Sequence, residues 1–293
     1  MRYRCQKGQA VLIVLLSLSV VLVVVMYILS RSVTDISLSI KDENAMRAFS
    51  AAEAGIERAL VAGSTGSQEI GGAGFEASVT DFAAGQTYVT YPISLKSGEL
   101  ATFWFVEHDD NGNLTCVASS CFTGDQIVLR WGDEGTSDSA ANTPAIELTV
   151  YYSNLVGNSP DLTTLKVARA TYDTFSSRRL NDNKFLAAYS GVQVIGTDRF
   201  QFHRTVNFED NLGIPNTALV QPIYATVKML YNTTPHKVGL VVTGGAVLPS
   251  QGSVIDSTGS YGDANRRISV YQLHPVVPPI FGNALYSGTG IVQ

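Results

Sequence analysis

The stretch AVLIVLLSLSVVLVVVMYIL, residues 10–29, decides how this 293-residue chain is built. It carries no charged side chain, and the uncharged run around it extends over residues 8–30. These 20 residues, at a rise of about 1.5 Å each, cover about 30 Å, the thickness of the hydrocarbon core of a bilayer. Because buried helices of soluble proteins seldom stay apolar on every face over this length, we expect a transmembrane helix.

The charges beside this run predict its orientation. Arg2, Arg4 and Lys7 precede it and only Arg31 follows closely, so the N-terminus is expected in the cytoplasm. A cleaved secretory signal is disfavoured because the run is too long and no Ala-x-Ala site follows it. A lipoprotein signal would need a cysteine after the run, whereas Cys5 precedes it. Two alternatives remain: a plain signal anchor, or a leader that is cut before the helix and leaves the helix on the mature protein.

The residues before the run favour the second alternative. The sequence MRYRCQKG, residues 1–8, is short, basic and ends in glycine, and Gln9 opens the apolar helix. This resembles the class III leader of the type IV pilin superfamily. The resemblance implies that a membrane-embedded prepilin peptidase cuts after Gly8 and that Gln9, the new N-terminus, is methylated. Taken alone, Gly8 is equally well explained as a flexible residue at a helix start.

A second segment carries the same resemblance. AFSAAEAGIERAL, residues 48–60, resembles the end of the long N-terminal helix in minor pilins of the PilX type and in related pseudopilins. The resemblance covers residues 1–60 and implies other pilin-like subunits and the pilus assembly machinery as partners. It also implies a single-pass location in the cytoplasmic membrane, with the C-terminal part outside, before entry into a cell-surface filament.

One position departs from the family pattern. Counted from Gln9, the fifth mature residue is Ile13, where major pilins usually carry a glutamate. In the family this glutamate is thought to pair with the terminal amine of a neighbouring subunit during assembly, and a buried carboxylate is unfavourable unless it is paired. Its absence favours a minor or tip-type subunit and leaves open a helix that never enters a filament.

The helix is expected to continue beyond the membrane, over residues 9–62. The part after residue 29 lacks proline, has Gly55 as its single glycine, and is followed by Gly63, a suitable C-terminal cap. Such a helix would be about 80 Å long. Its apolar positions form two stripes on nearly opposite sides. The lower stripe consists of Val33, Ile36 and Ile40, and the upper one of Leu38, Ala45, Phe49, Ala52, Ile56 and Leu60.

These stripes predict two different environments. We expect the upper stripe to pack on the globular part of the same chain, and Ile13 to belong to the part that packs against lipid or other subunits. The lower stripe either faces other subunits or extends the anchor into the membrane interface. Glu43 and Arg47 form a favourable i,i+4 pair on the polar side.

In residues 63–293, apolar and polar residues alternate with a period of two, which predicts β-strands. Ten or so strands without clear intervening helices indicate an extracytoplasmic, mostly antiparallel β domain that is sandwich-like. The fold class is therefore α+β. Residues 132–144, rich in Ser, Asp, Gly and Asn, are either a boundary between two β lobes or one long surface loop.

The cysteines fit an exported domain. Cys5 lies in the leader, so Cys116 and Cys121 remain as an even pair in the β domain. A disulfide is the favoured interpretation, and free thiols are the alternative. A metal site is disfavoured because no second cysteine pair or histidine cluster lies nearby in sequence.

No catalytic, cofactor or metal motif is predicted. His108, His203, His236 and His274 are scattered, without metal-ligand spacing, and no nucleophile elbow occurs. The stretch from Asp109 to residue 113 has oxygen side chains but lacks the closing glutamate of a calcium loop, so we expect a hairpin turn. A net charge of −5 provides no basic field for nucleic acid.

These observations predict a non-enzymatic subunit of a type IV pilus-like filament, with adhesion as a further role. Removal of the leader takes away three of the 20 basic residues, so that 17 remain against 25 acidic ones and the side-chain charge becomes −8. The alternatives are a single-span cell-surface binding protein that stays in the membrane and, less favoured, a surface glycan hydrolase.

Overall fold

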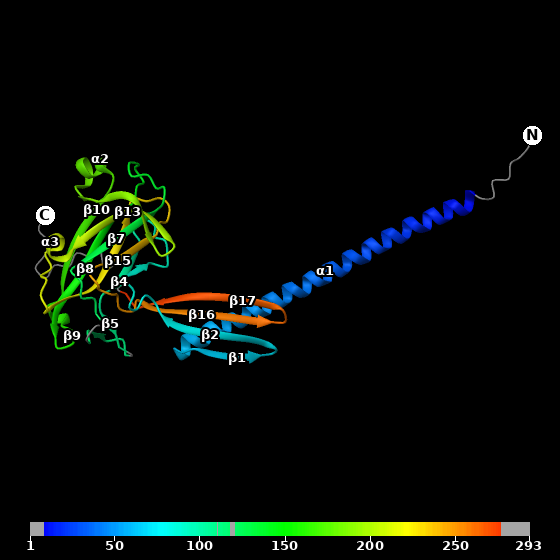
Figure 1. Cartoon of the computed structure of the whole chain (residues 1–293), viewed down its shortest axis with the longest axis horizontal. Coiled ribbons are helices and arrows are strands. Elements are labelled where there is room, and N and C mark those ends of the chain that lie inside the picture. Colours follow the sequence, from blue (N-terminus) through cyan, green and yellow to red (C-terminus); the bar gives the residue numbers. More distant parts are fainter. Residues whose placement is uncertain (1–8, 110, 118–120, 277–293) are drawn as a thin grey trace, which may run out of the picture. The chain divides into compact units, whose positions relative to one another are not determined.

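A computed structural model of the chain describes residues 9–109, 111–117 and 121–276 (Figure 1). A long N-terminal helix is followed by mostly antiparallel β-sheets, which makes the fold α+β. The chain forms two compact units. Unit 1 consists of residues 1–79 and 255–270, and unit 2 of residues 80–254 and 271–293. The predicted leader, residues 1–8, lies outside the described residues.

Helix α1 has the bounds that the sequence predicts, Gln9–Ala62. It ends because Gly63 takes a left-handed conformation, with φ at 61°. The N–H of Gly63 then donates a hydrogen bond of 2.8 Å to the carbonyl of Ala59, which caps the last turn.

Unit 1 adds a four-stranded sheet to this helix, in the order β1-β2-β16-β17. The strands are β1 (Gly66–Ile70), β2 (Ala73–Asp81), β16 (Gly252–Tyr261) and β17 (Ala264–Leu273). Gly71 and Gly72 both have positive φ and form the tight turn between β1 and β2. This hairpin joins the two strands next to the end of α1.

Unit 2 contains a six-stranded and a five-stranded sheet. The six-stranded sheet has the order β11-β10-β8-β14-β4 with β9 paired to β8, and the five-stranded sheet has the order β12-β13-β7-β15-β3. The bounds of the first are β4 (Leu100–Trp104), β8 (Ala145–Val156), β9 (Ser159–Pro160), β10 (Lys166–Asp173), β11 (Leu186–Ala187) and β14 (Val220–Leu230). Those of the second are β3 (Tyr88–Thr90), β7 (Gln126–Asp133), β12 (Tyr189–Ile195), β13 (Asp198–Asn207) and β15 (Val238–Val242).

The smaller elements of unit 2 complete the list. They are the hairpin of β5 (Glu107–His108) with β6 (Leu114–Thr115), the short helices α2 (Ser176–Arg178) and α3 (Phe208–Leu212), and the single turns η1 (Leu162–Thr164) and η2 (Arg179–Asn183). The parallel pair of β10 with β11 is the exception to the antiparallel pairings described here.

One core joins both sheets of unit 2. Leu148 and Val227 come from the six-stranded sheet, and Trp131, Phe202 and Leu240 come from the five-stranded one. All five side chains are fully buried. These buried positions alternate with less buried ones along β7 and β13, because successive side chains of a strand point to opposite faces.

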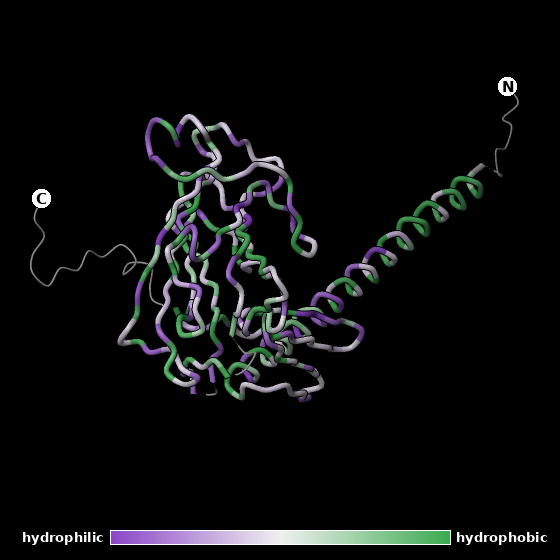
Figure 2. Tube along the Cα trace, turned by 60° about the vertical axis from the view of Figure 1, so that its left-hand side comes forward, coloured by the Kyte–Doolittle hydropathy of each residue, from purple (hydrophilic) through white to green (hydrophobic). Residues whose placement is uncertain are grey.

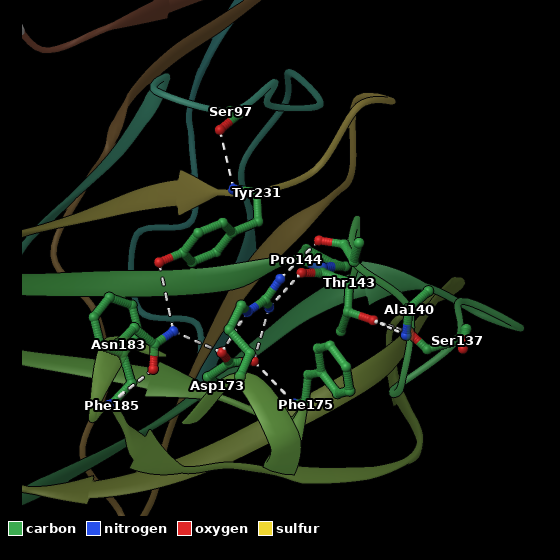
Figure 3. A network of polar contacts seen from close by, with 12 residues as sticks. Ser97, Ser137, Ala140, Thr143, Pro144, Asp173, Phe175, Asn183, Phe185 and Tyr231 are labelled. Carbon is green, nitrogen blue, oxygen red and sulfur yellow. Dashed lines mark hydrogen bonds and ion pairs between the residues drawn. The ribbon is translucent and has the colours of Figure 1, made fainter. Parts of the chain in front are cut away.

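The segment between β7 and β8 is a loop of unit 2, held by hydrogen bonds from the buried Arg178. Thr143 of this loop belongs to the same network of polar contacts as Asp173 (Figure 3). Arg178 donates hydrogen bonds of 2.8 Å to the carbonyls of Ala141 and Thr143 and forms a two-pronged ion pair with Asp173. Its guanidinium also lies 4.0 Å from the ring centre of Tyr231. Of the predicted range 132–144, the first two residues end β7, and residues 134–144 form a loop inside unit 2. The division into units falls elsewhere, within the strands β2, β16 and β17.

The charge of Asp173 is stabilised inside the protein. Burial disfavours ionisation of this carboxyl group, but hydrogen bonds from Arg178, Asn183 and the N–H of Phe175 outweigh burial and hold its pKa below the ordinary value. The carboxylate therefore stays ionised beside Arg178, and loss of Arg178 would leave a buried charge without its partner.

Candidate assembly helix

Residues 10–29, in the N-terminal half of α1, form a continuous apolar stretch (Figure 2). The helix is long and apolar enough to span a membrane, and its most apolar window has no buried residue. Ile13 is 65% exposed, and the other large apolar side chains of the run are exposed to a similar extent. This surface needs lipid or other helices as its surroundings, since exposed apolar area of this size is unfavourable in water.

Two serine hydroxyls within the apolar run donate hydrogen bonds to the backbone of the helix itself. Ser17 donates a hydrogen bond of 2.9 Å to the carbonyl of Val14, and Ser19 donates one of 2.8 Å to the carbonyl of Leu15. Both bonds hide the hydroxyl against the backbone, which lowers the energy of placing it in a hydrocarbon environment. The serines are therefore compatible with the proposed span.

The C-terminal quarter of α1 packs closely on the sheet of unit 1. Ala48 and Ala52 are fully buried there, and the facing strand residue is Gly259 of β16. A Cβ atom on Gly259 would lie 2.0 Å from the carbonyl oxygen of Ala48 and 2.4 Å from the backbone nitrogen of Ala52. Only glycine allows this approach of helix backbone to strand backbone.

A second close contact lies one turn further along the helix. Gly55, the single glycine of α1, faces Ser257 and Phe75, whose nearest atoms would be 2.2 Å and 2.8 Å from an added Cβ. Ile56 and Ala59 complete the buried face with Phe75, in one apolar cluster. We refer to the face formed by Ala48, Ala51, Ala52, Gly55, Ile56 and Ala59 as the helix seat.

Polar contacts secure the edge of the helix seat. Arg47 forms the predicted ion pair with Glu43, at 2.6 Å, and donates a hydrogen bond of 2.8 Å to the hydroxyl of Tyr261. Asn44 reaches Asp263 at 3.3 Å, in the turn that joins β16 to β17. These exposed contacts each contribute a few tenths of a kcal/mol to the attachment of the helix.

The observed seat is rotated from the predicted stripe. Ala52 and Ile56 are buried as expected, but Phe49 and Leu60 are 46% and 43% exposed and lie beside the contact. The physical reason is the close approach at Gly259, which favours small side chains in the centre and moves large ones to the flanks. The exposed Phe49 and Leu60 remain available to another surface, as do Ile13 and the apolar run.

The predicted cleavage site cannot be placed. Gly8 lies outside the described residues, and for Gln9 the backbone is helical while the side chain is not described. Cleavage after Gly8 and methylation of Gln9 therefore stay predictions.

The two cysteines of unit 2 are joined as predicted. Cys116 and Cys121 form a disulfide, and Cys121 is buried beside Val106 and Ile223. The bridge closes a short loop at the end of the β5–β6 hairpin. Residues 118–120 within that loop lie outside the described residues.

The Asp109 segment is the expected hairpin turn. Its carboxylate accepts hydrogen bonds from the N–H groups of Asn111 and Asn113 and from the side-chain amide of Asn113. The amide of Asn113 is the main cause of a lowered Asp109 pKa. The carboxylate thus serves the turn itself, between β5 and β6.

The fold brings together two histidines that are distant in sequence. The rings of His108 and His274 stack with centres 3.9 Å apart, and Trp104 lies edge-on to His108 at 4.4 Å. Burial, and next the neighbouring His274, lowers the pKa of His108 to about 4. Burial also lowers the pKa of His274. No motif in the sequence indicated that these two histidines lie together. No group of three or more metal-ligating side chains occurs among the residues that the structure describes.

No family model, curated protein or solved structure matches this chain. Membership of the pilin superfamily, inferred from residues 1–60, therefore stays a prediction.

Proposed function

We propose that this protein is a membrane-anchored, type IV pilin-like subunit of minor or tip type, with no enzymatic role. One observation carries the proposal: a single helix, α1, exposes apolar side chains along its first half and packs on the sheet of its own chain near its end. A membrane anchor alone needs about 20 residues, whereas this helix has 54.

The mechanism that fits this helix is a change of surroundings. Before assembly the apolar half lies in the bilayer, where lipid covers it. In a filament, neighbouring helices replace the lipid, and packing between side chains supplies the attraction, as between helices in membranes. Ile13 and its neighbours, together with the exposed flank residues Phe49 and Leu60, would form these contacts.

The minor or tip position rests on Ile13. Without a carboxylate there, the helix lacks the partner that would neutralise the terminal amine of an adjoining subunit. Such a subunit suits the start or the end of a filament, where one of the two neighbours is missing.

The rest of the chain would lie outside the cytoplasm. The excess of basic residues before the span favours this orientation, and the Cys116–Cys121 disulfide suits an oxidising compartment. We further propose that the two sheets of unit 2, which share one core, form a sandwich-like domain with an adhesive role.

The decisive experiment is mass spectrometry of the N-terminal peptide of the native protein. The proposal expects a chain that begins with methylated Gln9. The Gly8→Val variant should keep its leader when it is expressed with a prepilin peptidase, whereas Gly66→Ala, a glycine in strand β1, should be processed normally. A second measurement tests the filament role: when filaments are purified from the cells that produce this protein, the protein should be detected in them.

The second candidate is a single-span surface binding protein that stays in the membrane. The apolar residue at position 13 favours it, because no carboxylate is present to support assembly. An intact Met1 on the exported protein, together with filaments that lack the protein, would refute the pilin proposal and support this candidate.

A further inference from the structure

Unit 2 contains a cleft of about 500 Å³ whose walls combine aromatic, aliphatic and polar side chains. It lies along the edge strand β3, the turn between β12 and β13, and Tyr271 of β17. Its volume falls within the range of small-molecule sites, roughly 300–1,000 Å³. The sequence could not reveal it, because its walls come from segments that are far apart along the chain.

Four aromatic rings line the cleft, and their neighbours hold them in place. Phe82 and Tyr271 meet edge to face, with ring centres 5.1 Å apart. Tyr91 packs on Phe103 in the same manner at 6.1 Å. Tyr88 lies beside Gly196, where an added Cβ would be 3.7 Å from its ring. The rings are therefore fixed before any ligand binds.

Two of these rings are open to solvent. Tyr88 is 42% exposed and Tyr271 is 47% exposed, and both lie on the wall of the cleft. Exposed tyrosines in a concave site present a flat apolar face with a polar hydroxyl at its rim, and such a ring binds an apolar face of a ligand with little loss of entropy.

The polar groups of the cleft have unused hydrogen-bonding capacity. Among the described residues, the hydroxyls of Tyr88, Tyr271 and Ser94 and the side-chain amide of Gln86 have no hydrogen-bond partner. Hydroxyls both donate and accept, and an amide offers one group of each kind. The cleft can therefore bind a ligand that is itself rich in hydroxyl groups.

The charges at the rim are balanced. Lys237 lies 2.6 Å from Asp198, and both side chains line the cleft. Lys237 is the one cation and Asp198 the one carboxylate among the lining residues described. An anionic ligand would have to compete with the ion pair, and the two carboxyl groups of a glycoside hydrolase are not assembled here.

We propose that this cleft is a binding site for a neutral saccharide. The C–H faces of the sugar would stack on Tyr88 and Tyr271, while its hydroxyls would bond to Gln86, Ser94 and the free oxygen of Asp198. Aromatic faces together with convergent neutral polar groups select this chemistry over phosphates and acidic sugars. The site uses no residue of α1 and stands independently of the filament proposal.

The test measures binding of a panel of neutral mono- and disaccharides of hexoses and N-acetylhexosamines. The full chain in detergent is titrated and followed by saturation-transfer NMR and by calorimetry. At least one neutral sugar should bind with a Kd at or below about 10 mM. Tyr88→Ala and Tyr271→Ala should each weaken binding roughly tenfold, because each removes one stacking face.

Matched variants separate recognition from folding. Tyr189→Ala, a 56% exposed tyrosine on β12 outside the cleft, should leave the Kd unchanged. Tyr88→Phe keeps the ring and should lose less affinity than Tyr88→Ala. This comparison of two variants at position 88 tests the proposal even if Tyr271→Ala fails to fold. Absence of binding by every neutral sugar overturns the proposal, as do cleft variants that bind normally. A uronic acid that binds more tightly than its neutral counterpart, or a peptide that binds where no sugar does, also overturns it.

Discussion

Replacing Gly259 by alanine should loosen α1 from the sheet of unit 1. The added methyl group would stand 2.0 Å from the carbonyl oxygen of Ala48 and 2.4 Å from the backbone nitrogen of Ala52. Both neighbours are backbone atoms of a regular helix, so neither can rotate away. Gly259 does not have positive φ, and alanine fits its strand conformation; the effect therefore comes from the clash alone.

The magnitude follows from the distance that must be recovered. Non-bonded heavy atoms need about 3.5 Å, so the helix would have to move by more than an ångström from β16. Overpacking typically costs about 1–3 kcal/mol, and the rigid neighbours place this case at about 3 kcal/mol. The same movement would separate Ile56 from Phe75, which share the apolar cluster.

Hydrogen–deuterium exchange of the full chain in detergent measures this effect locally. A loss of about 3 kcal/mol should speed exchange of the helix peptide covering residues 48–62 roughly 100-fold. The control is Gly66→Ala in β1, where the nearest atom to an added Cβ, on Arg58, is 3.9 Å away. If the peptide covering residues 48–62 exchanges as slowly in Gly259→Ala as in the wild type, the helix and the strand do not approach each other as closely as described.

Three further predictions concern unit 2. Arg178→Met leaves the buried carboxylate of Asp173 without its partner and should lower the free energy of unfolding, measured in urea, by about 3–5 kcal/mol. The control Arg179→Met should change this free energy little, and equal effects of the two variants would contradict the ion-pair argument. The pKa of His108 is lowered from 6.5 to about 4, so the folded form binds fewer protons and stability should fall as pH drops from 6.5 towards 4. His108→Phe should flatten that part of the stability profile, and an unchanged profile would refute the assignment. Cys116→Ser with Cys121→Ser should lower stability by about 2 kcal/mol, as should a reductant on the wild type, and no shift in the melting curve would count against the bridge.

Much of the architecture could be read from the sequence because it depends on local order. The helix from Gln9 to Ala62 follows from a continuous apolar run, the absence of proline and a glycine at its end. The inward-facing side of β8 and β14 follows from alternation with a period of two, and the pairing of Cys116 with Cys121 follows from their proximity in the chain.

The helix seat shows where local order stops being sufficient. A helical wheel correctly selected Ala52 and Ile56, but it also selected Phe49 and Leu60, which stay about half exposed. Hydrophobicity alone ranks large side chains first. The contact instead favours small ones, and this preference comes from Gly259, about 200 residues later in the chain.

The sequence by itself determined the apolar run, the length of α1 and the alternating strands, because these depend on neighbours within a few residues. Only the tertiary structure decided the rotation of the helix seat, the stacking of His108 on His274 and the meeting of Tyr88 with Tyr271 in one cleft. Each of these brings together segments that are far apart in the sequence. Such contacts depend on how the elements pack in three dimensions, which no local pattern encodes.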